Sequence, residues 1–166
     1  MTKFRTGLTA ATVLAALALT TSAEAKGTVR VRGSNGHAAA TAGARGVAGR
    51  AGGTVTAADG TVTHASGGAF AGANGARGAR ASSTSVSPDG TVNHQGAAAT
   101  SGARGSASTQ GSFTRNANGT ATGSRTTNAT NAYTGNSYSG STSVDNGKVS
   151  HTGTCTNASG AMIPCR

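Results

Sequence analysis

The chain has 166 residues, a formal net charge of +10 and only 4 acidic residues. Beyond residue 25 its large apolar side chains are nine Val, two Phe, two Tyr, one Ile and one Met. Burying such a side chain contributes about 1.5 to 3 kcal/mol, whereas ordering each residue's backbone costs about 1 to 2 kcal/mol. The composition therefore excludes a conventional globular core. It leaves a low-complexity chain that is mostly disordered or all-β.

Residues 1–25 have the features of a cleavable signal peptide. Lys3 and Arg5 give a positive start, residues 8–19 are apolar, and Ala23 and Ala25 are small residues suited to a cleavage site. The apolar run is shorter than the roughly 20 residues that span a bilayer. We expect an N-terminal signal helix, cleavage after Ala25 and no transmembrane span afterwards. The protein would then be secreted, periplasmic or on the cell surface.

Residues 26–53 form a basic segment rich in Gly and Ala. Its first part, TVRVR at residues 28–32, alternates Val with Arg. As a strand, this sequence places Val29 and Val31 on one face and Arg30 and Arg32 on the other. We expect it to begin the first repeat as an amphipathic edge.

Residues 54–153 contain drifted repeats with a period of about 28 to 30 residues, a length typical of repeat architectures. Their turn glycines are Gly60, Gly90, Gly119 and Gly147. Asp-Gly and Asn-Gly favour tight hairpin turns, so each unit is predicted to be a β-hairpin. The predicted registers place Val86 opposite Val92 and Val144 opposite Val149. The alternative is a set of flexible loops, because an isolated hairpin is marginal in water.

Spacers rich in Gly, Ser, Thr, Asn and Ala separate the predicted hairpins. GARG occurs in them at residues 43–46, 75–78 and 102–105, and residues 93–143 contain no Val, Leu or Ile. Such composition is compatible with a linker, with disorder or with a polar β stack.

Residues 154–166 contain the two cysteines of the chain, Cys155 and Cys165. In an exported protein this pair favours a disulfide. Closing the loop would contribute about 2 to 3 kcal/mol in the entropic model. We expect the loop, which carries Met162 and Ile163, to cap the repeat array; the alternative is a docking tip.

Positive charge is spread along the chain and is mostly arginine, the side chain suited to phosphate and carboxylate. The Asp residues lie only in predicted turns. This pattern favours an extended polyanion as partner: lipopolysaccharide, acidic polysaccharide, another cell-surface glycan or released DNA. The alternative is that the charge serves solubility. The candidate polyanion-binding residues are Arg30, Arg32, Arg45, Arg50, Arg77, Arg80 and Arg104.

Four histidines, His37, His64, His94 and His151, recur at matching repeat positions. Stacked units would align them, but repetition alone explains their recurrence, so we predict no metal site and no cofactor. No nucleophile motif such as G-x-S-x-G occurs, and the chain lacks an apolar shell for a pocket. We therefore expect neither a small-molecule substrate nor an enzyme.

These observations lead to the expectation of an exported, non-enzymatic basic protein that associates with extracellular polyanions. The alternative is a self-assembling structural subunit of the extracellular matrix, in which hairpins stack between molecules into fibres.

Overall fold

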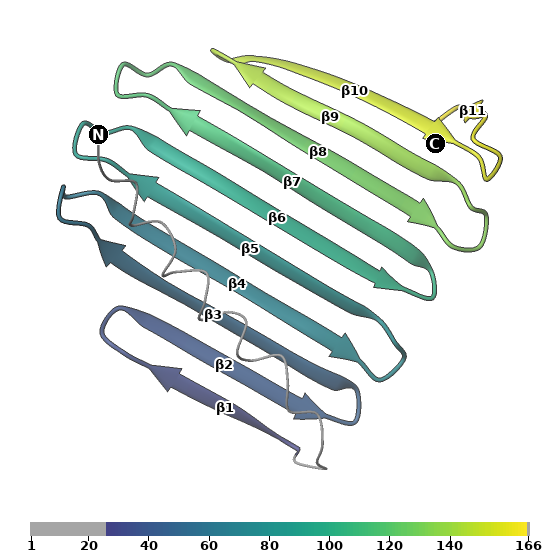
Figure 1. The fold of residues 1–166 in the computed structure, drawn as a ribbon, viewed down its shortest axis with the longest axis horizontal. Helices are drawn as coiled ribbons and strands as arrows, with labels where there is room; N and C mark the ends of the chain where they lie inside the picture. Colours follow the sequence, from purple (N-terminus) through teal and green to yellow (C-terminus); the bar gives the residue numbers. More distant parts are fainter. Residues whose placement is uncertain (1–25, 166) are drawn as a thin grey trace, which may run out of the picture.

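The structure is a computed structural model that describes residues 26–165. In this part of the chain eleven strands form one antiparallel sheet, and each strand pairs with the next along the sequence (Figure 1). The all-β alternative is thus confirmed, whereas the expected signal helix lies outside the described residues. No helix within residues 26–165 is long and apolar enough to cross a membrane.

The strands are mostly long and similar in length. They are β1 Gly27–Arg32, β2 Gly36–Gly43, β3 Gly46–Thr56, β4 Val62–Gly72, β5 Arg77–Val86, β6 Val92–Gly102, β7 Gly105–Arg115, β8 Ala121–Asn131, β9 Ser137–Asp145, β10 Lys148–Thr156 and β11 Met162–Ile163.

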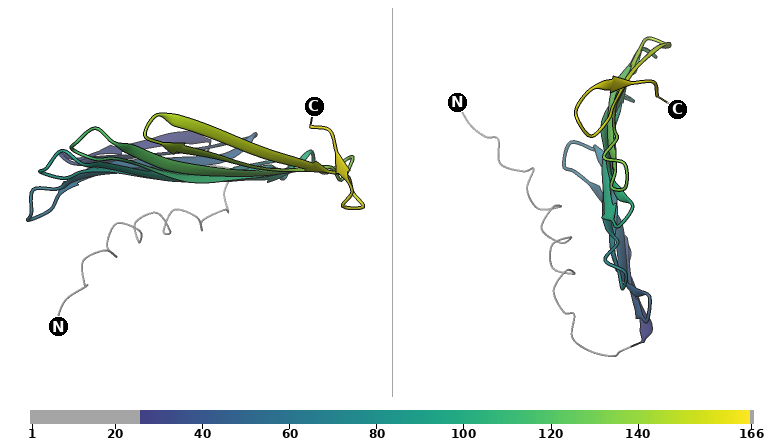
Figure 2. Two further views of the ribbon diagram at one scale, coloured as in Figure 1. Left: turned by 90° about the horizontal axis from the view of Figure 1, so that it is seen from above. Right: turned by 90° about the vertical axis from the view of Figure 1, so that its right-hand side faces the viewer.

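Residues 26–165 form a single layer of sheet, and no second layer among them covers either face (Figure 2). Among the described residues no hydrophobic, polar or charged side chain is buried. The excluded globular core is therefore absent from this part of the chain. Instead, the backbone N–H and C=O groups of the long strands pair with one another in one continuous ladder of hydrogen bonds.

Four five-residue turns share one geometry and join β3 to β4, β5 to β6, β7 to β8 and β10 to β11. In the second, the N–H of Ser87 donates to the carbonyl of Thr91 (2.9 Å) and the N–H of Gly90 donates to that of Ser87 (2.9 Å). The fourth residue of each turn is a glycine with φ between +83° and +86°, a conformation that glycine adopts without steric cost. The turn fixes the register, and Val86 pairs with Val92 as expected.

Shorter turns complete the meander. Asn146 and Gly147 form a two-residue turn that pairs Val144 with Val149, as predicted. The GARG sequences at residues 43–46 and 102–105 are turns between β2 and β3 and between β6 and β7. Of the alternatives for the spacers, the β stack is therefore right, because they consist of strands and turns of the same sheet.

Pairing assigns each strand residue to one of two faces, because directly opposed residues share a face and neighbours along a strand alternate. One face carries Arg50 and Arg80 and is called the arginine face. The other, the second face, carries Ala79 and Ala99. In β1 the expected alternation is confirmed: the two Val lie on the second face and the two Arg on the arginine face.

Aromatic rings pack on glycines of the arginine face. A Cβ at Gly78 would meet the ring of Phe70 on the opposed strand, and a Cβ at Gly123 would lie 3.0 Å from the ring of Phe113. The rings thus lie over positions that have no side chain. The two rings therefore cover backbone on a face over which the described residues place no second layer.

Near the C-terminus the predicted disulfide is present, between Cys155 and Cys165. It holds β11 against the end of β10, where Cys155 pairs with Ile163 and Thr156 with Met162. The loop therefore covers the outer edge of β10 at its last two residues.

Candidate functional site

Six arginines project from the arginine face, and all six are exposed. They are Arg30, Arg32, Arg50, Arg80, Arg115 and Arg125. They come from five strands, β1, β3, β5, β7 and β8, so the sheet gathers charges that are far apart in the sequence.

Three of these arginines lie in one row that crosses the sheet. The pairing runs from Arg30 through Ala39 to Arg50, then through Gly68 to Arg80. Adjacent strands are about 4.8 Å apart, so successive arginines on every second strand are about 10 Å apart. Such spacing places the charges along an extended ligand better than around a compact one.

Small residues between the arginines form the floor of the row. Gly68 lies directly between Arg50 and Arg80, and a Cβ at that position would lie 3.4 Å from the Cβ of Arg50. Nearby, the Nε–H of Arg125 donates to Oγ1 of Thr109 on the neighbouring strand (2.8 Å). This contact orients the guanidinium through Nε and leaves its terminal nitrogens for a ligand.

An open groove of about 550 Å³ lies among these side chains and extends over β3 to β8. Arg50, Arg80 and Arg125 line it, with Phe70 at one part of its wall and small residues such as Ala98 on its floor. A second hollow shares Arg80 and Arg125 and continues toward His94 and Phe113. The groove thus offers guanidinium donors, with aromatic surface beside them.

The strand residues of the arginine face include no carboxylate. Asp145 is on the second face opposite Lys148, and Asp59 and Asp89 lie in the five-residue turns. In the turn at Asp89, the N–H of Thr91 donates to Oδ1 (2.8 Å) and its hydroxyl to Oδ2 (3.0 Å). These hydrogen bonds lower the pKa of Asp89 below its ordinary value of 3.8. The carboxylate of Asp89 therefore accepts hydrogen bonds within its own turn.

The four histidines also lie on the arginine face. Three face a threonine on the paired strand and contact its hydroxyl through Nδ1: His64 with Thr54 (3.0 Å), and in the same way His94 with Thr84 and His151 with Thr142 (both 2.8 Å). His64 and His94 share a row but are two strands apart. Within residues 26–165 no three His, Cys, Asp or Glu side chains are grouped so that they could hold a metal ion.

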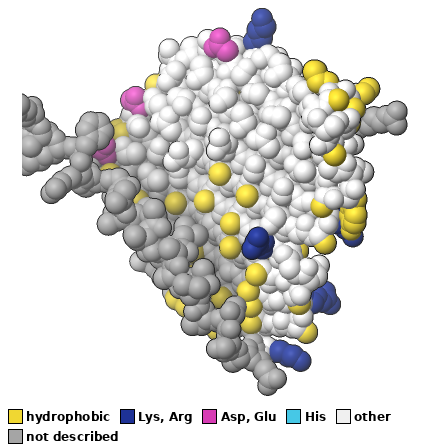
Figure 3. All heavy atoms as spheres, turned by 45° about the vertical axis from the view of Figure 1, so that its right-hand side comes forward, with side chains coloured by type: hydrophobic (Ala, Val, Ile, Leu, Met, Phe, Trp, Pro, Cys, Tyr) yellow, Lys and Arg dark blue, Asp and Glu magenta, His cyan; other side chains and the backbone are white. Residues whose placement is uncertain are grey.

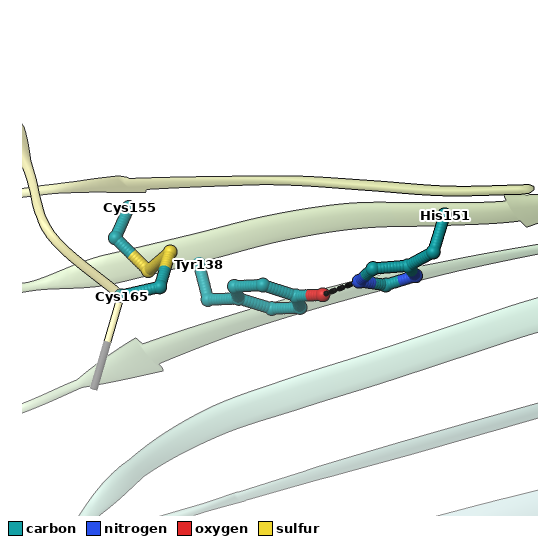
Figure 4. Close-up of a disulfide and its surroundings, with 4 residues drawn as sticks. All are labelled: Tyr138, His151, Cys155 and Cys165. Atoms are coloured by element: carbon teal, nitrogen blue, oxygen red, sulfur yellow. Dashed lines mark hydrogen bonds between the residues drawn. A yellow bond between two sulfur atoms is a disulfide. The ribbon is translucent and has the colours of Figure 1, made fainter.

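The disulfide and a tyrosine form the end of this face near β10 (Figure 4). The ring of Tyr138 lies over Gly140 and Gly153, and its hydroxyl is 3.3 Å from Nε2 of His151. Cys155 is paired with Tyr138 across the strands. The cluster packs the stapled end of the sheet through contacts among its own side chains.

The seven candidate arginines do not all lie on one surface. Arg30, Arg32, Arg50 and Arg80 are on the arginine face, whereas Arg45 and Arg104 are in turns at one end of the sheet. Arg77 begins β5 on the second face.

Two arginines of the face, Arg115 and Arg125, were missed by the sequence reasoning. Their register relative to the glycine turn at residues 116–120 is a signal that could have found them. Arg115 directly precedes that turn, and its pairing with Ala121 fixes the face of every residue in β8.

No protein-family model, curated protein or solved structure matches this chain.

Proposed function

We propose that this is an exported, non-enzymatic protein whose arginine face binds extracellular polyanions. The observation that supports this proposal most directly is the set of six exposed arginines on one face whose strand residues include no carboxylate. Polymers that carry phosphate, sulfate or carboxylate groups match such a face, because guanidinium groups contact these anions in pairs of hydrogen bonds. The disulfide is compatible with export.

The test measures binding of the purified, oxidised protein to heparin and to double-stranded DNA over a range of salt concentrations. If six arginines contact phosphates of DNA, the slope of log K against log salt should be about −5. The variant R50Q/R80Q/R125Q should reduce that slope by about 3 units and weaken binding by about 100-fold at 0.1 M salt.

The matched control is R45Q/R77Q/R104Q, which removes the same charge from positions outside the arginine face. It should change the slope by less than 1 unit. Equal losses in both variants would show that net charge alone attracts the polymer, and absence of binding in the unmodified protein would refute the proposal.

A fibre subunit is the second candidate, supported by the open edge of β1. This edge strand has no partner on its outer side within the described sheet, and such edges are templates for pairing with another chain. On the opposite edge the disulfide loop pairs with Cys155 and Thr156, and the rest of the outer edge of β10 has no partner within the described sheet. Fibres in electron micrographs that form with rising protein concentration would favour this candidate.

A further inference from the structure

The second face changes in chemistry across the sheet. From β1 to β5 its residues are all Gly, Ala or Val except Thr63, Arg77, Ser83 and Ser85. In Figure 3 hydrophobic side chains are scattered over the lower part of the visible face, nearest β1, and much of the upper part carries none. We call the second-face residues of β1–β5 the alanine face.

The alanine face is exposed in part: its residues in β1 and at Ala69 and Ala79 are exposed, those in β2 are half-buried, and Gly67 is buried. Val29 and Val55 are 68% and 61% exposed there, and Val31 is also largely exposed. The Gly, Ala and Val positions of this face adjoin one another across β1–β5, and exposed apolar residues grouped in this way mark an interaction site. Single-layer flat sheets are likewise stabilised by stacking.

We propose that two copies of this chain pack through their alanine faces into a closed sandwich dimer. The five strands β1–β5 contain 46 residues. At about 16 Å² of sheet per residue, the product of strand spacing and rise, each copy offers about 740 Å². The total of about 1,500 Å² is that of a standard stable protein interface.

Charge determines which faces meet. Two arginine faces repel each other, and an arginine face laid on an alanine face would bury guanidinium groups without partners. The alanine face has one charged side chain, Arg77, which begins β5 at the margin of the patch. Apolar contact between two alanine faces is therefore the arrangement that leaves every arginine of both arginine faces in water.

The sizes of the facing side chains are compatible with a dimer whose two-fold axis lies between the two copies and runs parallel to β3. This axis would place Val29 and Val31 of β1 over the partner's Ala79 and Ala81 of β5, so that large side chains meet small ones. A closed two-fold contact uses the same patch on both copies and does not propagate. It thus differs from growth through strand edges.

The dimer would carry an arginine face on each outer side. This consequence rests on the proposed function: one dimer could then link two polyanion chains. The dimer itself is measured without polyanion, so failure of dimerisation and failure of polyanion binding are separate results.

The experiment is sedimentation equilibrium of the purified, oxidised protein in neutral buffer without polyanion. A monomer–dimer equilibrium is expected. A69D, a charge in the middle of the alanine face on an exposed position of β4, should weaken dimerisation at least 100-fold. The matched control T126D puts the same charge on the second face of β8, outside the alanine face, and should leave dimerisation within 3-fold.

V31K is the second variant, because an edge strand accepts lysine and no strand among residues 26–165 pairs with the outer side of β1. It should also weaken dimerisation at least 100-fold while its circular dichroism spectrum stays unchanged. The proposal would be overturned by a protein that is monomeric at all concentrations, whether or not it floats with neutral phosphatidylcholine vesicles. Growth into open-ended species would overturn it too. Equal loss of dimer in T126D and A69D would overturn it as well.

Discussion

The two halves of the second face have the same backbone but different chemistry. In β1–β5 this face carries Gly, Ala and Val at all but four positions, whereas in β7–β10 it carries Ser, Thr, Asn and Gln with one Asp and one Lys. The polar half forms cross-strand contacts such as Ser143 with Ser150 (2.7 Å). Both halves nevertheless belong to one continuous ladder of backbone hydrogen bonds. The comparison shows that turns and backbone hydrogen bonds define the sheet, and that side chains define what each surface can bind.

The largest expected effect tests whether both halves depend on the same turns. Gly46 and Gly105 end equivalent GARG turns with φ of +121° and +137°, and a Cβ at either would collide with a backbone carbonyl. G105A should therefore cost roughly 3 kcal/mol or more of unfolding free energy, and G46A should do the same, as measured by urea denaturation.

A control for these variants is G119A, because Gly119 also has a positive φ but open space around its Cβ position. It should cost only about 1 kcal/mol. If G46A were harmless and G105A severe, the two halves would not depend on turns equally, and the comparison above would be wrong.

A smaller effect concerns the staple that only the polar half has. C155S/C165S should lower the free energy of unfolding by about 2 to 3 kcal/mol, because the cross-link restricts the unfolded chain. Hydrogen exchange should rise first in β9 to β11 and least in β1 to β5. The unmodified protein under reductant should behave like the variant, and unchanged stability in both would refute a stabilising role.

The smallest expected effect separates the two five-residue turns that have Asp at their third position from the turn that has Asn118 there. The pKa values of Asp59 and Asp89 are below 3.8, mainly because the backbone N–H of Thr61 and of Thr91 donates to them. A lowered pKa in the folded state means that this stabilisation is present above pH 3.8 and is lost as the pH falls through the folded-state values.

The measurement is the amide NMR signal of these turns during acidification. Signals of Thr61 and Thr91 should shift with midpoints below pH 3.8, whereas Thr120, whose N–H donates to Asn118 (3.0 Å), provides the control and should not shift. A shift of all three together would instead indicate that the whole sheet opens in acid.

Sequence patterns predicted those parts of the fold that depend on specific chemistry. The Asn-Gly and Asp-Gly turns gave the registers of Val86 with Val92 and of Val144 with Val149, and the cysteine pair gave the disulfide. The continuous sheet could not be chosen over disorder, because Gly, Ala, Ser and Thr carry little hydrophobic periodicity. Their strands are defined by the turns on either side.

Which arginines share a face depends on two things: the alternation of residues along each strand and the register between strands. Arg77 and Arg80 are three positions apart, so a continuous strand places them on opposite faces. Arg125 lies on the same face as Arg80 because the lengths of the turns between β5 and β8 determine the register of each strand pair. The sequence spacing of arginines alone contains no information on these turn lengths, so the site could be predicted only in part.

One consequence concerns the order in which strands meet. Every extensive contact in the described sheet is between consecutive strands, so a whole hairpin of two strands and two turns is a self-contained module. Insertion or loss of such a module would change the width of the sheet by about 10 Å and leave the remaining pairs unaltered. The width of the sheet, and with it the number of arginines along a row, could thus change during evolution by simple gene duplication or deletion.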